Sequence, residues 1–177
     1  MRTGLMVIWF LGIGITSAAQ VYQTQLGTIM ATGMYKSVIV SAVSNQLLIN
    51  LNYENARMRL RVMISSFVTE NDSLNEMLHK LLGQELAFEG KMNIAFIQTK
   101  SHPRQKFATQ GLLFLNGITR PYSFSSVLEH FPRANTSCIL SGEFIIDLKQ
   151  FKIKNLPPGE EKITVKFNQL VLKKSGD

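Results

Sequence analysis

Strict alternation of polar and apolar residues is the feature of this sequence that most constrains its fold. Between Arg57 and Ile64, three arginines occupy every second position, and Met58, Leu60, Val62 and Ile64 lie between or after them. Successive side chains of a β-strand point to opposite faces, so this pattern predicts a strand with one solvated and one buried face. We therefore expect a chain built largely from half-buried strands.

The same alternation recurs along most of the chain. An extra residue between Phe167 and Leu170 shifts the alternation by one position, which predicts a β-bulge. Asn116-Gly117 separates two apolar runs, which predicts a tight hairpin turn. The expected strands cover residues 38–43, 47–53, 57–64, 88–96, 107–115, 118–128, 137–148 and 163–172.

One segment has helical rather than strand periodicity. Ser73 and Glu76 have the spacing of a capping box, and Gly83 is suited to end a helix in the left-handed conformation. The expected apolar stripe consists of Leu74, Met77, Leu78, Leu81 and Leu82. A helix with such a stripe needs an apolar surface. The sequence thus predicts a mainly all-β protein, a closed or nearly closed antiparallel barrel of about eight strands with one helix across an open end or side.

The first nineteen residues have the layout of a secretory signal peptide. Arg2 precedes an apolar run from Leu5 to Ile15, and small residues end at Ala19. This run is shorter than the roughly 20 residues of a membrane-spanning helix, although a retained anchor stays an alternative. Cleavage after Ala19 gives a mature chain from Gln20. With no cysteine at the junction, we expect a periplasmic or secreted protein that is not a lipoprotein, with residues 20–177 as one domain.

Composition argues against several classes of function. The net charge is +7, but the basic residues are dispersed, so we expect no nucleic-acid binding. Cys138, the only cysteine, lies in a strand pattern and is expected to be a buried, inert thiol. His79, His102 and His130 lack the spacing of metal ligands. No catalytic motif is recognised, so we expect neither an enzyme nor a metal or cofactor site.

Apolar strand faces are the remaining candidates for function. They either fill the core or line an elongated cavity, and the sequence leaves both alternatives open. The adaptable methionine side chains favour a ligand. The candidate cavity-lining residues are Met58, Leu60, Val62, Ile64, Phe88, Met92, Ile94, Phe96, Phe144 and Ile146.

Several motifs in the second half resemble the YceI-like family of exported lipid-binding proteins. They are Phe88-Glu89-Gly90-Lys91-Met92, the run from Gln110 to Pro121, and the run from Gly142 to Ile153 with its Leu-x-x-Phe-x-Ile ending. The resemblance covers about Val21 to Lys173. It departs from the family where a Tyr-Pro segment is usual after the helix, because only Gly83-Gln84-Glu85 stand there.

The resemblance implies an extended lipocalin-like barrel that holds a polyisoprenoid, an isoprenoid quinone or a fatty-acid-like lipid, without catalysis. Transport of such a ligand is the leading hypothesis, and peripheral membrane contact accompanies it. The alternative is a structural, assembly or stress-related envelope protein that docks without a ligand on a membrane protein or anionic lipid. Arg57, Arg59 and Arg61 would then be its contacts. The oligomeric state stays open, a dimer included.

Overall fold

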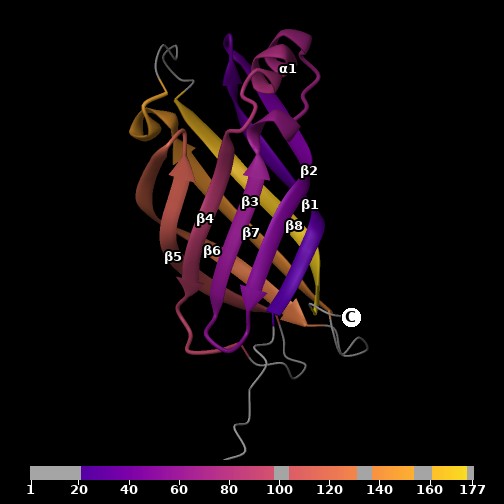
Figure 1. The fold of residues 1–177 in the computed structure, drawn as a ribbon, viewed down its shortest axis with the longest axis vertical. Helices are drawn as coiled ribbons and strands as arrows, with labels where there is room; N and C mark the ends of the chain where they lie inside the picture. The colour runs from indigo at the N-terminus through magenta and orange to yellow at the C-terminus, as the bar shows by residue number, and fades with distance from the viewer. Residues whose placement is uncertain (1–20, 98–103, 131–136, 154–160, 175–177) are drawn as a thin grey trace, which may run out of the picture.

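Eight antiparallel strands form a closed barrel in the computed structural model, which describes residues 21–97, 104–130, 137–153 and 161–174 (Figure 1). Each strand pairs with its neighbours in sequence, and β1 pairs with β8 to close the sheet. The strands are β1 (Val21–Tyr35), β2 (Val38–Asn52), β3 (Arg57–Met63), β4 (Glu85–Met92), β5 (Gln105–Leu115), β6 (Ile118–His130), β7 (Ser137–Asp147) and β8 (Lys162–Lys174). The predicted fold class is confirmed.

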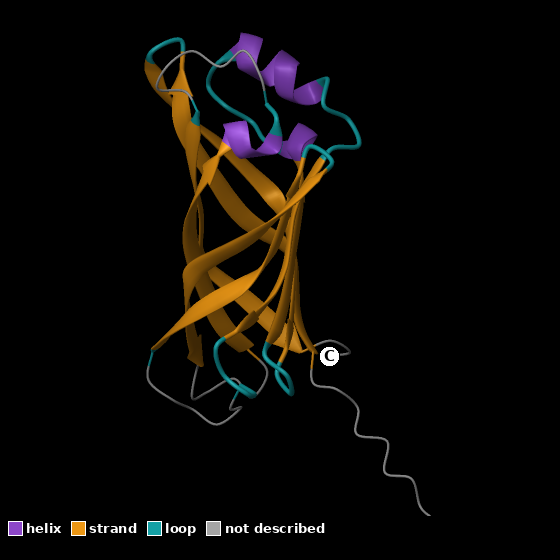
Figure 2. Ribbon diagram, turned by 90° about the vertical axis from the view of Figure 1, so that its left-hand side faces the viewer, coloured by secondary structure: helices purple, strands orange, loops and turns teal. Residues whose placement is uncertain are grey.

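Helical segments gather at one end of the barrel (Figure 2). They are η1 (Ile64–Ser66), α1 (Asp72–His79) and η2 (Leu148–Phe151). Leu78 of α1 packs against the core, and Phe151 of η2 is fully buried. We call this the helical end; the opposite end carries the start of β1 and the end of β8. None of the described helices is long and apolar enough to span a membrane.

The helix begins two residues earlier than the capping-box pattern predicted. Asn71, rather than Ser73, is the N-cap, and its side chain accepts a hydrogen bond of 2.9 Å from the Leu74 amide. Asn75 fixes the preceding turn, because its Oδ1 accepts from the amide and the hydroxyl of Thr69. The expected apolar stripe is only partly used: Met77 is 52% exposed, and Leu82 lies beyond the helix and is 79% exposed.

Strand boundaries differ from the predictions at three places. β1 was not predicted, because register shifts between Thr24 and Ile29 break its alternation. The two runs at 38–43 and 47–53 are one strand, β2, interrupted by the same irregularity. The strand predicted for 88–96 was wrong at its end: β4 stops at Met92, and Ile97 then donates a hydrogen bond to the Tyr53 carbonyl across the barrel end.

The predicted bulge and hairpin are confirmed. Gly142 pairs with Phe167 while Leu140 pairs with Leu170, so β8 carries one extra residue between these pairs. Asn116 and Gly117 connect β5 and β6 with φ values of 52° and 70°, as a primed two-residue turn requires. Lys36 and Ser37 build the same kind of turn between β1 and β2 without any glycine.

Gly117 provides a test of this turn. A Cβ added there would meet no atom within 4 Å, so Gly117→Ala isolates the cost of a left-handed backbone. We expect the free energy of unfolding to fall by about 1–2 kcal/mol, measured by urea denaturation. Gly117→Asn should lose less, since asparagine tolerates this conformation. Equal stability of the alanine variant and the wild type would contradict the turn geometry.

Candidate functional site

The barrel interior is filled by the inward faces of its strands. Leu60, Leu113, Ile146 and Val165, from four different strands, are all 0% exposed. A side chain beside a water-sized void would keep some accessible surface. The middle of the barrel is therefore closely packed in this structure, and a ligand that entered it would have to displace side chains.

Seven of the ten candidate cavity-lining residues point inward and are buried. These are Met58, Leu60 and Val62 of β3, Phe88 and Met92 of β4, and Phe144 and Ile146 of β7. Ile64 in η1 and Ile94 after β4 are half-buried against the core. Phe96 does not face the interior: it is 57% exposed, because the chain leaves the sheet after Met92. Whether any of the ten binds a ligand stays a prediction.

An aromatic cluster occupies the interior toward the helical end. Phe124 lies at its centre, with ring-centroid distances of 5.0 Å to Phe88, 5.0 Å to Phe144 and 6.3 Å to Phe167. Tyr122 extends the cluster outward, 6.0 Å from Phe144. Tyr122 and Phe124 were missed as candidates, although they alternate with Ser123 and Ser125 inside a predicted strand.

Glycines let two of these rings lie directly against the barrel wall. A Cβ on Gly142 would stand 2.4 Å from Cζ of Phe167, the residue paired with it across β7 and β8. A Cβ on Gly90 would stand 2.5 Å from Cζ of Phe88. Both glycines lie on inward-facing positions, so no side chain separates the backbone from the ring at these two places.

The cluster reaches the surface where two neighbouring strands separate. Pairing between β6 and β7 runs from His130–Cys138 to Ser125–Glu143 and goes no further. We call the unpaired stretch, residues 118–124 of β6 and 144–147 of β7, the seam. A depression of about 600 Å³ lies along it, lined by Pro121, Tyr122, Ser123, Phe124, Glu143, Phe144 and Ile145.

The seam joins an apolar floor to a polar rim. Phe124 and Phe144, only 7% and 4% exposed, form part of the floor. Burial, with a smaller contribution from the nearby Asp147 carboxylate, raises the pKa of Tyr122, so its hydroxyl stays protonated at neutral pH. At the rim, Lys166 forms an ion pair of 3.2 Å with Glu143. Such a site suits an amphiphile better than a charged substrate.

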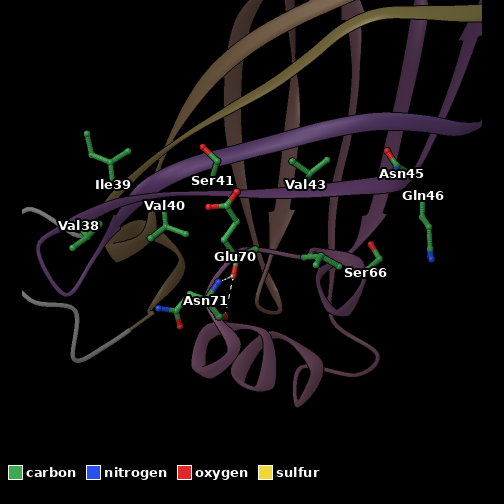
Figure 3. Close-up of a pocket in the computed structure, with 12 residues that line it drawn as sticks. Val38, Ile39, Val40, Ser41, Val43, Asn45, Gln46, Ser66, Glu70 and Asn71 are labelled. Atoms are coloured by element: carbon green, nitrogen blue, oxygen red, sulfur yellow. Dashed lines mark hydrogen bonds between the residues drawn. The ribbon is translucent and has the colours of Figure 1, made fainter.

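A larger concavity, about 1010 Å³, lies outside the barrel near the helical end (Figure 3). It runs between β2 and the segment that follows η1, and it is lined by residues 38–41, 43, 45, 46, 66 and 68–71. It includes none of the aromatic cluster. Despite its smaller volume, we take the seam as the candidate ligand site, because inward-facing aromatic side chains line it.

The other end of the barrel is closed by polar aromatic groups. The rings of Tyr22 and Tyr53 stack at 4.0 Å, and the Tyr53 hydroxyl forms a hydrogen bond of 2.8 Å with Nε2 of His130. His130 was expected in a connection but ends β6, where it is 8% exposed. The pair Thr109–Ser126, also fully buried, is joined by a hydrogen bond of 2.7 Å. These contacts pair the Tyr53, Thr109 and Ser126 hydroxyls inside the barrel.

The sequence predicted neither a catalytic nor a metal-binding site. The described residues contain no group of three or more histidine, cysteine, aspartate or glutamate side chains that could hold a metal ion. His102 lies outside the described residues.

The arginines of β3 do not form a free cationic surface. Arg59 pairs with Glu89 at 3.2 Å, and Arg61 pairs with Glu85 at 2.7 Å. Only Arg57 lies opposite another cation, Lys91. Since two of the three arginines are neutralised by their neighbours, docking on an anionic surface through this face gains no support.

These observations define a class of protein and then a family. A closed eight-stranded antiparallel barrel with apolar inward faces is lipocalin-like. The chain belongs to the YceI-like domain family, which matches residues 17–170. The resemblance inferred from the sequence motifs is thus confirmed. A search of curated proteins found no match.

Solved structures share the fold at low sequence identity. One is a polyisoprenoid binding domain from Saccharophagus degradans implicated in plant cell wall breakdown: its TM-score is 0.65 at 9% identity, over 89% of this chain and 98% of that chain. Another is BcnA from Burkholderia cenocepacia: its TM-score is 0.63 at 11% identity, over 82% and 94%. A mutant CJ YCEI protein with a monobromobimane guest has a TM-score of 0.56 at 11% identity, over 100% and 94%.

Gly142 and Phe167 allow a test of the packing at the barrel wall. Gly142→Ala should lower the free energy of unfolding by about 1–3 kcal/mol, because its Cβ would push the Phe167 ring into the packed interior. The double variant Gly142→Ala/Phe167→Leu should lose less free energy of unfolding than the sum of the losses of the two single variants, because leucine leaves room for the added Cβ. Strict additivity in a double-mutant cycle by urea unfolding would show that the two residues do not touch.

Cys138 was expected to be inert, and it is fully buried. Burial raises the pKa of its thiol from 9.0 to about 11, with a smaller opposing effect of the Tyr53 hydroxyl. The thiol therefore stays protonated below that pH in the folded protein. We expect slow reaction with a thiol reagent at pH 8 and fast reaction in urea, measured by absorbance.

The raised thiol pKa of Cys138 also predicts how the free energy of unfolding depends on pH. The contribution of this thiol is fully present below pH 9 and declines as the pH rises toward 11.

Proposed function

We propose that this protein binds and carries a long-chain hydrophobic ligand of the polyisoprenoid, isoprenoid quinone or fatty-acid type, and that it does so without catalysis. The observation that carries the proposal is the seam, where an aromatic cluster continuous with the apolar core reaches the surface. A polyisoprenoid binding domain with the same fold supports the choice of ligand class.

The ligand would enter between β6 and β7 and take the place of aromatic side chains. Phe124 and Phe144 form the part of the floor closest to the unpaired edges, so their rings would move first. A hydrocarbon of about ten carbons gains about 8 kcal/mol on burial, at about 0.8 kcal/mol per CH2, whereas exposing two phenylalanines costs about 3–6 kcal/mol. Burial of this chain exceeds the cost of displacing both rings by about 2–5 kcal/mol, and a longer chain adds to this margin against the cost of association. The polar rim at Tyr122 would face the ligand's head group.

Export completes the proposal. The signal-like segment, residues 1–19, lies outside the described residues, so its cleavage after Ala19 rests on the sequence pattern. A carrier in the periplasm or outside the cell would shield a hydrocarbon from water while it moves between membranes. N-terminal sequencing of the exported protein tests this part, with Gln20 as the expected first residue.

Tryptophan fluorescence can test ligand binding at the seam. The chain from Gln20 contains no tryptophan, since Trp9 is the only one in the sequence. Phe144→Trp therefore places a single reporter at the seam. We expect farnesol and a longer polyprenol to change its emission in a saturable way, with the longer chain binding more tightly because it buries more CH2 groups. Native mass spectrometry of the wild type should show the same complexes.

A matched pair of variants separates binding from folding. Phe144 points inward and is 4% exposed, whereas its neighbour Ile145 points outward and is 55% exposed. Phe144→Arg should abolish or strongly weaken polyprenol binding, because it places a charge where the hydrocarbon would lie. Ile145→Arg should leave binding unchanged, with circular dichroism confirming that both variants fold. Failure of the wild type to take up any of these lipids would refute the proposed function.

A further inference from the structure

One edge of β2 has no strand partner near the helical end. β3 pairs with β2 only from Leu48 to Asn52, and a single bridge joins Val43 to Val68. On its other side, β2 is paired with β1 as far as Val38. The stretch of β2 from Val38 to Ala42 therefore uses only one of its two edges in the described part of the chain.

The hairpin register identifies the main-chain groups on this open edge. A two-residue turn makes the flanking residues, Tyr35 and Val38, a hydrogen-bonded pair. Alternation then directs the N–H and C=O groups of Ile39 and Ser41 away from β1. Val43 has the same parity and faces the same way: its amide donates to the Val68 carbonyl, and its carbonyl accepts from the Val68 amide, both at 2.9 Å. Ile39 and Ser41 thus present two donors and two acceptors.

The concavity of about 1010 Å³ lies along this edge (Figure 3). Its far wall is the segment 66–71, which hydrogen bonds between Thr69, Asn71 and Asn75 hold in place. In Figure 3, the side chain of Glu70 extends from this wall toward β2. The groove is thus preformed, with main-chain groups on one side and a carboxylate on the other.

The residue types at the open edge of β2 are suited to pairing with an added strand. Residues 38–43 contain no charge and no proline, the devices that usually protect exposed edges. Val38 is 62% exposed and Ile39 is 75% exposed. Apolar side chains on both faces of an open edge are typical of sites of β-strand addition.

We propose that this groove binds an extended peptide segment of another polypeptide as an added antiparallel or parallel strand, with a basic side chain facing Glu70. The groove ends at the Val43–Val68 bridge, where β2 and the facing segment pair directly. An added strand would pair with the donors and acceptors of Ile39 and Ser41, and Glu70 on the facing wall favours a peptide with a basic side chain. This peptide site lies outside the barrel and is independent of the lipid site proposed above.

Main-chain pairing can be tested by a proline at the open edge. Ser41→Pro removes a donor that no strand of the described structure uses, so the hairpin should stay intact. The matched control Ser41→Ala loses the same hydroxyl contact with Thr32 but keeps the amide. The probe is a short, blocked synthetic peptide of alternating valine and threonine with one central lysine. Calorimetric titration should give binding to the wild type and Ser41→Ala, and binding at least about tenfold weaker to Ser41→Pro.

Two further measurements keep the proposal falsifiable if Ser41→Pro unfolds. A probe N-methylated at the positions that pair with β2 should not bind the wild type, and Glu70→Gln should weaken binding of the lysine probe but not of a glutamine version. Equal binding of the methylated probe would overturn the proposal. A dimer in light scattering that depends on this edge would also overturn it. So would binding of the protein through Ile39 to phosphatidylcholine vesicles, if the vesicles displace the peptide and Ser41→Pro leaves their binding unchanged.

Discussion

The hydrogen-bonded closure between β1 and β8 is the constraint on which the rest of this structure depends. It joins Thr32 to Thr164 near one end and Tyr22 to Lys174 near the other. A closed sheet has an inside, so the apolar face of every strand is withdrawn from water together. Without closure, the alternating strands would form a sheet with two unprotected edges and an exposed apolar face.

Closure also explains which parts of the molecule were predictable from the sequence. Alternation specified that Met58, Leu60 and Val62 share a face, and it specified the phase shift in β8, because both are properties of a single strand. It failed at β1, where register shifts interrupt the pattern, and after Met92, where the chain leaves the sheet although apolar residues continue to Phe96. Local periodicity records side-chain direction, but not where a neighbouring strand ends.

The candidate site depended on information that no single segment contains. Phe144 was selected as an inward residue, but the seam exists because pairing stops at Ser125–Glu143, a property of two strands together. Phe124 is central only because Phe88, Phe144 and Phe167 converge on it from three other strands. The outer groove is likewise set by the distance between β2 and the segment after η1, which the sequence pattern did not indicate.

A closed barrel limits where other molecules can interact with its main chain, and the seam and the end of β2 are places among the described residues where pairing is incomplete. At the seam, the unpaired edges frame inward aromatic side chains, so a hydrocarbon that fits there replaces one apolar contact by another. At the end of β2, the unpaired edge faces outward beside Glu70, and no aromatic core lies behind it. Hydrocarbon has no groups to satisfy main-chain donors and acceptors, whereas a peptide strand has both. The two places therefore favour different partners, although both arise from incomplete pairing in the same sheet.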